Sequence, residues 1–142
     1  MTYPVDDAPV RALLERTRVI AVVGLSSRED RPSNDVAAYL QRVGYRIVPV
    51  NPRETEVLGE RAYPSLLDLP EDLRVDLVDV FRRAEATPEV ARQAVAIGAP
   101  ALWLQLGIEN DEARRIAEDA GLEVVMDRCS KVDHRRFQEG SP

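Results

Sequence analysis

The first segment that could carry chemistry follows the first strongly apolar run of the chain, Val19–Val23. Six candidate residues for binding an anion come after it: Gly24, Leu25, Ser26, Arg31, Ser33 and Asn34. Backbone N–H groups at a helix N-terminus present a partial charge of about +0.5, which favours a bound anion. We therefore predict that Gly24, Ser26 and Ser33 cradle a pyrophosphate at a helix start. Ser33 is expected to be the N-cap of that helix, and Arg31 to neutralise charge.

An ordinary connection between a strand and a helix would contain the same residue types. Gly24 stands where the first glycine of the dinucleotide motif GxGxxG falls, but the second and third glycines are missing. In this alternative, Ser33 only caps the helix and the arginine side chains are solvated. The loop alone leaves both interpretations open.

A second loop begins with Asn51, Pro52 and Arg53, directly after a predicted strand. Domains that bind NAD place Asp or Glu here to hold the adenosine ribose hydroxyls. Asn51 followed by Arg53 disfavours NAD and favours a nucleotide with an extra ribose phosphate, either NADP or coenzyme A. The alternative is a simple turn in which Asn51 and Pro52 end the strand.

Two further loops supply the remaining candidate residues, Val80, Phe81, Arg82, Gln105 and Gly107. Phe81 could pack against an adenine ring and Arg82 could reach a phosphate; in the alternative interpretation, Phe81 belongs to the core and Arg82 to the solvated surface. Gln105 is polar near the end of a buried strand, and Gly107 permits close backbone approach, so both could border the distal arm of a ligand. Asp79 lies in an apolar strand and is expected to accept hydrogen bonds, because buried charges are paired.

The elements that position these loops alternate regularly along the chain. Apolar runs predict strands over 19–23, 45–50, 76–81, 101–106 and 123–126. Helices with a period of 3.6 residues lie between them and end at Gly44, Gly98 and Gly121, each directly before the next strand. This alternation predicts an α/β fold, a Rossmann-like doubly wound parallel sheet of about five strands with helices on both faces. We expect one domain over 1–142, with a short helix at about 6–16 and a core at about 18–137.

Composition excludes several classes of function. The formal net charge of -6 disfavours a general nucleic-acid surface, although all but Lys131 of the 19 basic side chains are Arg, the residue type suited to phosphate. One Cys and one His cannot form a Cys/His zinc site, a disulfide framework or a CxxC pair. We expect no metal and no membrane span, and a cytoplasmic location, because disulfide potential and a signal-like start are both missing.

Five segments in order carry a family resemblance: VVGLSSREDRPS, VPVNPRETEVLGERAYPSL, VDLVDVFRR, LWLQLGI and VVMDRCSKVDH. Through them the chain resembles the small single-domain coenzyme A-binding proteins of bacteria and archaea. That family is similar in fold to the coenzyme A-binding domain of the succinyl-CoA synthetase alpha chain. The resemblance implies that the 24–33 loop receives the pyrophosphate and that 51–53 and 80–82 surround the adenosine. It also implies that Gln105 lies toward the pantetheine arm.

The resulting hypothesis is a coenzyme A or acyl-CoA binding protein that acts as a sensor, carrier or accessory subunit, without catalysis and with an unidentified protein partner. His134 does not match the phosphohistidine motif of the synthetase, which argues against a ligase. Two alternatives stay open. One is acyl transfer or thioester hydrolysis that uses Gln105, Cys129 or His134, and the other is an NADP-binding redox module.

Overall fold

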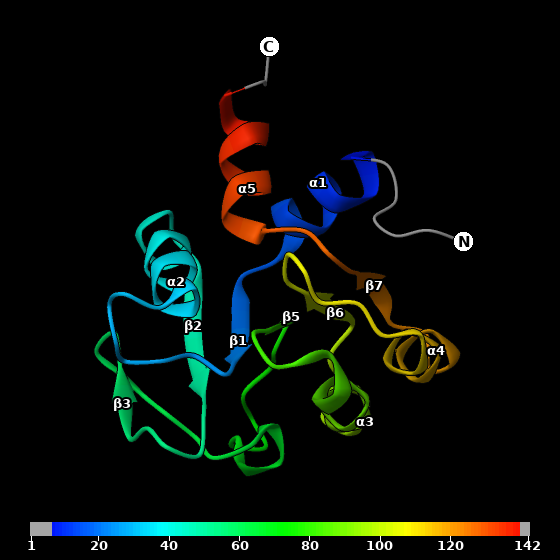
Figure 1. Cartoon of the computed structure of the whole chain (residues 1–142), viewed down its shortest axis with the longest axis horizontal. Coiled ribbons are helices and arrows are strands. Elements are labelled where there is room, and N and C mark those ends of the chain that lie inside the picture. Colours follow the sequence, from blue (N-terminus) through cyan, green and yellow to red (C-terminus); the bar gives the residue numbers. More distant parts are fainter. Residues whose placement is uncertain (1–6, 140–142) are drawn as a thin grey trace.

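The structure is a computed structural model that describes residues 7–139 (Figure 1). Five strands form the main sheet: β1 Val19–Val23, β2 Arg46–Val50, β5 Leu77–Val80, β6 Ala101–Leu104 and β7 Glu123–Val125. The α-helices are α1 Asp7–Arg16, α2 Pro32–Arg42, α3 Thr87–Ala96, α4 Asp111–Asp119 and α5 Ser130–Glu139. The 3₁₀ turns η1 and η2 cover Leu66–Asp68 and Ala84–Ala86. Residue 6, the expected start of the first helix, lies outside the described residues.

The main sheet is entirely parallel, with strand order β2-β1-β5-β6-β7. The chain runs from β1 outward to β2, then crosses over to β5 on the other side of β1. The order therefore reverses between β1 and β5, and in such sheets ligands bind beyond the carboxyl ends of the strands at this point. The predicted fold class is confirmed.

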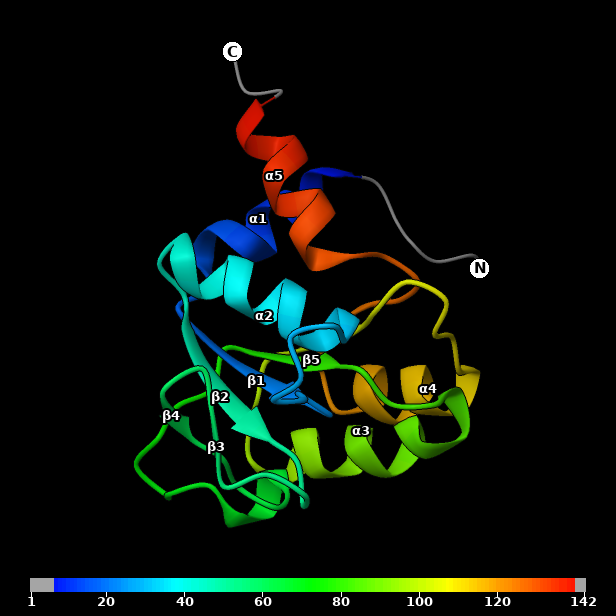
Figure 2. The ribbon, with the colours of Figure 1, turned by 60° about the vertical axis from the view of Figure 1, so that its left-hand side comes forward.

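Helices cover both faces of the sheet, with α1, α2 and α5 on one face and α3 and α4 on the other (Figure 2). Successive strand side chains alternate between two apolar clusters, as the period of a strand requires. In β1, for example, Ala21 and Val23 pack toward α3 and α4, whereas Ile20 and Val22 pack toward α1, α2 and α5. Burial on both faces explains why the strands read as continuous apolar runs.

The predicted glycine stops are confirmed by the geometry of the helix ends. After α4, Gly121 has φ +88, and the Leu122 N–H donates to the Ala117 carbonyl at 2.9 Å, as in a Schellman ending. A left-handed residue that stops the helix also turns the chain directly into β7. The strand therefore begins within two residues of the glycine.

One small element was not predicted. Strands β3, Glu56–Val57, and β4, Glu60–Arg61, form an antiparallel hairpin beside β2. Leu58 and Gly59 between them both have positive φ, 56° and 78°, as a two-residue hairpin turn requires. Strands of two residues are too short to show alternation, so no sequence pattern marked them.

Candidate functional site

The loops after β1 and β5 meet at Gly24, at the point where the strand order reverses. Gly24 has φ +88, and a Cβ atom there would lie 2.5 Å from the Phe81 carbonyl oxygen and 3.2 Å from the Arg82 Cδ atom. The Gly24 N–H donates to the Val50 carbonyl at 2.8 Å, which also fixes the end of β2. Gly24 therefore allows the ends of three neighbouring strands to come together, with the Arg82 side chain beside it.

Asn51 joins the second loop to the first. Its amide nitrogen donates to the Leu25 carbonyl at 3.0 Å, and its Oδ1 accepts from the Arg53 N–H at 2.9 Å. The residue thus makes the turn that the alternative interpretation expected, and it also holds the 24–33 loop in place. An Asp at this position could accept from Arg53 but could not donate to Leu25.

Ser33 does not cap α2, contrary to the prediction. Arg31 occupies the N-cap position without a side-chain capping bond, and Pro32 is the first helical residue. Proline fits that position because its fixed φ is helical and the missing N–H would be unsatisfied anyway. Ser33 is therefore inside the first turn, where its Oγ accepts from the Ser26 N–H at 3.1 Å.

Asn34 and Ser33, at the start of α2, hold the 24–33 loop in place through hydrogen bonds to Ser26. The Asn34 amide donates to the Ser26 carbonyl at 2.9 Å, and both side chains are buried, at 6% and 5% exposure. These two side chains hold the shape of the loop. Its outer surface is formed by the exposed residues 27–32.

Three successive amides of the loop already form hydrogen bonds with side-chain oxygens. The Ser26 amide bonds to Ser33, the Ser27 amide donates to the Glu54 carboxylate at 2.9 Å, and the Arg28 amide donates to the Ser26 hydroxyl at 3.1 Å. Glu54, from the loop after β2, is the only charged group of the three acceptors. Sequence reasoning missed Glu54, because nothing local indicates that it reaches a loop 27 positions earlier.

Three predicted arginines remain exposed at this edge: Arg31, Arg53 and Arg82. Within residues 7–139, none of them forms an ion pair, whereas Arg28 in the same loop pairs with Asp30 at 2.9 Å. Guanidinium groups without carboxylate partners favour bound phosphate. This edge is therefore locally suited to an anion although the protein is acidic overall.

A buried polar cluster lies at the adjoining strand ends and consists of Asp79, Gln105 and Ser130. The Gln105 amide donates to Asp79 Oδ1 and, at 2.8 Å, to the Ser130 hydroxyl, which in turn donates to Asp79 Oδ2 at 3.0 Å. Burial raises the pKa of Asp79 to about 7, although the hydrogen bonds from Gln105 and Ser130 oppose that rise. Asp79 accepts hydrogen bonds as predicted, while the Gln105 amide points into the protein and is used there.

The remaining candidate site residues differ in how far they are exposed to solvent. Leu25 and Val80 are fully buried in the two apolar clusters, so neither residue is accessible to a ligand in this structure. Phe81 is half-buried against the cluster beneath α1, α2 and α5, and Pro52 is exposed. Gly107 is exposed, and its N–H donates to the Asp127 carboxylate at 2.7 Å, which ties the loops after β6 and β7 together.

Two kinds of feature are missing from residues 7–139. They contain no group of three or more His, Cys, Asp or Glu side chains placed to hold a metal ion. Among the helices of the same range, none has the length and apolar character needed to cross a membrane.

A parallel sheet whose strand order reverses beside a glycine-led loop defines the class of Rossmann-like α/β domains. The chain belongs within that class to the family described as CoA binding domain, whose model matches residues 18–135. The predicted family resemblance is therefore confirmed.

Three similar proteins support this family assignment. The chain is 44% identical over 127 residues to the uncharacterised protein YneT of Bacillus subtilis (strain 168), covering 89% of this chain and 93% of YneT. It is 32% identical over 120 residues to acetate–CoA ligase [ADP-forming] I of Archaeoglobus fulgidus, covering 79% of this chain but 18% of the ligase. A solved hypothetical protein from Pyrococcus horikoshii OT3 matches with a TM-score of 0.91 at 39% identity, covering 97% of this chain and 98% of its own.

Proposed function

We propose that this protein binds coenzyme A or an acyl-CoA at the carboxyl edge of β1, β2 and β5. We also propose that it acts as a sensor, carrier or accessory subunit for a protein partner, without catalysis of its own. One observation carries the proposal. Three strand ends close on Gly24, and each of the loops that follow them carries an exposed arginine, Arg31, Arg53 or Arg82, that forms no ion pair within residues 7–139. Family membership then favours coenzyme A over other phosphorylated nucleotides.

The chemistry of this edge fits the parts of coenzyme A. Arg31 and the 24–33 loop would hold the diphosphate, Arg53 the ribose 3′-phosphate, and Phe81 with Arg82 the adenine end. Gly107 would border the pantetheine arm through its backbone. Gln105 would act there through the buried cluster with Asp79 and Ser130, because both of its amide hydrogens are engaged. Bound coenzyme A would supply the thiol or thioester.

The separation of His134 from Gln105 supports a role without catalysis. His134 lines a cavity at the amino edge of the sheet, together with residues that precede β1 and β2. Gln105 is used in the buried cluster, and Cys129 packs against the apolar cluster beneath α1, α2 and α5. A thioester at the carboxyl edge would therefore not meet Gln105 and His134 together.

Calorimetry with coenzyme A and dephospho-coenzyme A tests the site. We expect coenzyme A to bind roughly tenfold or more tightly, because charge-assisted hydrogen bonds to the 3′-phosphate are lost without it. Arg53→Ala should abolish that difference. Arg46→Ala, a change of the same type at the amino end of β2, should preserve it. Equal affinity for the two ligands in the unmodified protein would contradict the role of Arg53.

Two further measurements separate the alternatives. Incubation with acetyl-CoA and succinyl-CoA should release no thiol above the buffer rate, and turnover that Cys129→Ser or His134→Ala abolishes would establish an enzyme instead. Coenzyme A should raise the melting temperature more than NADPH at equal concentration, because tighter binding to the folded state stabilises it more. The reverse order would favour the redox module.

A further inference from the structure

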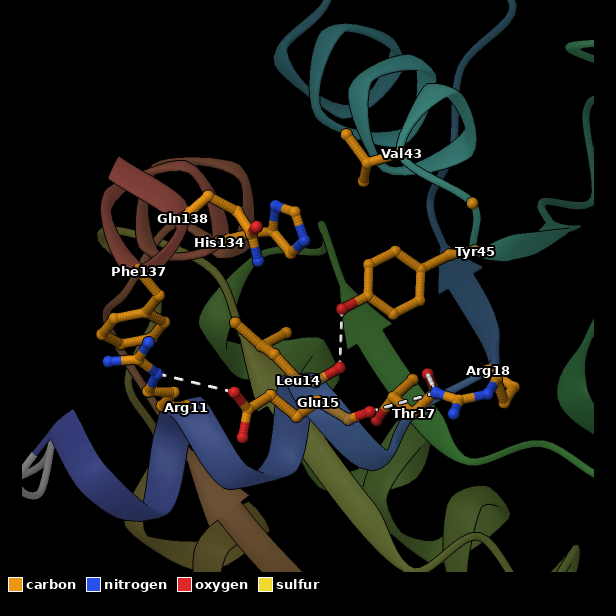
Figure 3. A pocket seen from close by; sticks show the side chains of 11 residues that line it. Arg11, Leu14, Glu15, Thr17, Arg18, Val43, Tyr45, His134, Phe137 and Gln138 are labelled. Atoms are coloured by element: carbon orange, nitrogen blue, oxygen red, sulfur yellow. Dashed lines mark hydrogen bonds and ion pairs between the residues drawn. The ribbon is translucent and has the colours of Figure 1, made fainter. Parts of the chain in front are cut away.

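A cavity of about 400 Å³ opens between α1, α5 and the turn that joins α2 to β2 (Figure 3). Thr17 and Arg18, which line it, directly precede β1, and Gly44 and Tyr45 directly precede β2. The cavity therefore lies at the amino edge of the sheet. A ligand there would be separate from the loops that follow β1, β2 and β5.

One part of the cavity wall is apolar. Leu14 lies between the rings of Phe137 and Tyr45, and Val43, at 43% exposure, lies at the side of the opening (Figure 3). The Tyr45 hydroxyl donates to the Leu14 carbonyl at 2.6 Å, which fixes the ring as a wall. Burial raises the pKa of Tyr45 to about 12, against the opposing effect of the Arg18 cation, so the hydroxyl keeps its proton at neutral pH.

His134 presents an oriented imidazole to the same cavity. The Tyr39 hydroxyl lies 2.7 Å from His134 Nδ1, and the imidazole meets the rings of Tyr39 and Tyr45 edge to face at 5.5 Å and 5.7 Å. Burial lowers the pKa of His134, which favours the neutral ring at pH 7. With Nδ1 engaged, Nε2 is the ring atom left to bond with a ligand.

The two arginines that line the cavity differ in the contacts that their guanidinium groups make. Arg11 lies 3.5 Å from the Glu15 carboxylate and stacks over the Phe137 ring. Arg18 uses only Nη1, which donates to the carbonyls of Glu15 and Thr17 at 3.0 Å and 3.1 Å. These bonds hold the guanidinium in place, while its Nε and Nη2 groups make no hydrogen bond within residues 7–139. Arg18 is therefore a cation held in a fixed position, and its Nε and Nη2 groups can donate hydrogen bonds to a ligand.

We propose that this cavity is a second ligand site, which binds a small organic carboxylate with an apolar body. The carboxylate accepts hydrogen bonds from Arg18, and the body packs on Leu14 and Tyr45. His134 Nε2 is available to a polar group farther along the ligand. The cavity volume falls within the roughly 300–1,000 Å³ that ligand pockets span. The site does not depend on coenzyme A binding at the opposite edge.

Titration with hexanoate, followed by ¹H–¹⁵N NMR of the full chain, tests the proposal. We expect saturable shifts at Val43, Tyr45 and His134, with the 24–33 loop unchanged. Hexanamide, which has nearly the same shape without the charge, should bind roughly tenfold more weakly because it loses the charge-assisted bonds. Equal binding of hexanoate and hexanamide, or no saturable shift at the cavity, would overturn the proposal.

Two variants complete the test. Val43→Trp should fill the opening and abolish the hexanoate shifts, and Arg18→Gln should bring hexanoate affinity close to that of hexanamide. The NMR spectra themselves report whether each variant is folded. Coenzyme A should still bind Val43→Trp with unchanged affinity, so the outcome for the cavity is independent of the outcome for the carboxyl edge. Hexanoate binding that survives both variants would place it outside this cavity and overturn the proposal.

Discussion

Gly24 and Glu54 show how single residues shape the carboxyl edge. Gly24 is a position where the backbones of two loops approach closely, and a side chain there would meet the Phe81 carbonyl. Glu54 places a carboxylate on the Ser27 amide, in the loop predicted to hold a diphosphate. Substitution of Gly24 is predicted to lower the stability of the fold. Substitution of Glu54 is predicted to raise the affinity for the ligand.

Gly24→Ala should destabilise the fold more than an alanine at another left-handed glycine. Gly121 is the matched control, because it has the same φ of +88 but a Cβ atom at that position would meet nothing within 4 Å. The backbone conformation alone costs about 1–2 kcal/mol. The contact with Phe81 should add about 2 kcal/mol at Gly24. Urea unfolding measures both, and equal losses in the two variants would contradict the close approach.

Glu54→Gln should strengthen coenzyme A binding. The substitution keeps an acceptor for the Ser27 amide but removes a negative charge beside the predicted diphosphate. At about 4 Å in water-like surroundings, one charge pair amounts to roughly 1 kcal/mol, or about fivefold in affinity. Glu56→Gln, two positions along the chain in the short strand β3, serves as the control and should change little. Weaker binding by Glu54→Gln would show that the carboxylate contacts the ligand favourably instead.

At the scale of elements, the buried cluster of Asp79, Gln105 and Ser130 connects β5, the end of β6 and the start of α5. A carboxyl group in the middle of the sheet is costly when ionised, because burial removes its water. The raised pKa of Asp79, about 7, expresses that cost. The packing of α5 on the sheet is therefore linked to the protonation of a single side chain.

Asp79→Asn should remove a pH dependence of stability. Asp79 has a folded pKa of about 7 against 3.8 for the free side chain, so the folded state holds the proton more tightly. Its contribution to the free energy of unfolding is present below pH 3.8 and is lost as pH rises through about 7. The loss is on the order of 4 kcal/mol.

Urea unfolding between pH 5 and about 8 checks this expectation. The unmodified protein should lose stability relative to Asp79→Asn as pH rises, and the difference should level off above about pH 7. Asp7, whose pKa is lowered by hydrogen bonds from Arg136 and Arg128, acts only in more acidic solution and does not interfere. Parallel stability curves for the two proteins would contradict the prediction.

At the scale of the whole molecule, the distribution of charge matters more than its sum. The protein carries a formal net charge of -6, yet Arg31, Arg53 and Arg82, which form no ion pair within residues 7–139, are exposed on the loops predicted to hold an anionic ligand. Local and global electrostatics therefore act in opposite directions on coenzyme A. Ionic strength distinguishes them, because salt screens whichever effect dominates.

Raising the salt concentration from about 0.05 M to about 0.5 M should weaken coenzyme A binding several-fold. Salt screens the attraction between the nearby guanidinium groups and the phosphates, which weakens binding. If repulsion by the negative net charge were dominant, salt would screen that repulsion and strengthen binding. Calorimetry across the salt series measures the sign. Tighter binding at high salt would show that the arginines do not hold the phosphates.

The sequence by itself determined the order of the elements and the loops that could form a site. Continuous apolar runs, helical periodicity and glycine stops were sufficient for the parallel fold, because these patterns reflect burial and local backbone conformation. The conformations of the short β3–β4 hairpin and the start of α2 at Pro32 were not predicted. Both depend on one or two residues, which is too little for a periodic signal.

Only the tertiary structure decided what each polar side chain of these loops contacts. Ser33 and Asn34 brace the loop, the Gln105 amide bonds to Asp79 and Ser130, and Glu54 reaches back to Ser27. Such partners come from segments far apart in the chain, and side-chain direction follows from packing rather than from residue type. The same reason explains the cavity at the amino edge, whose walls come from α1, α5 and the turn before β2 and adjoin only after folding.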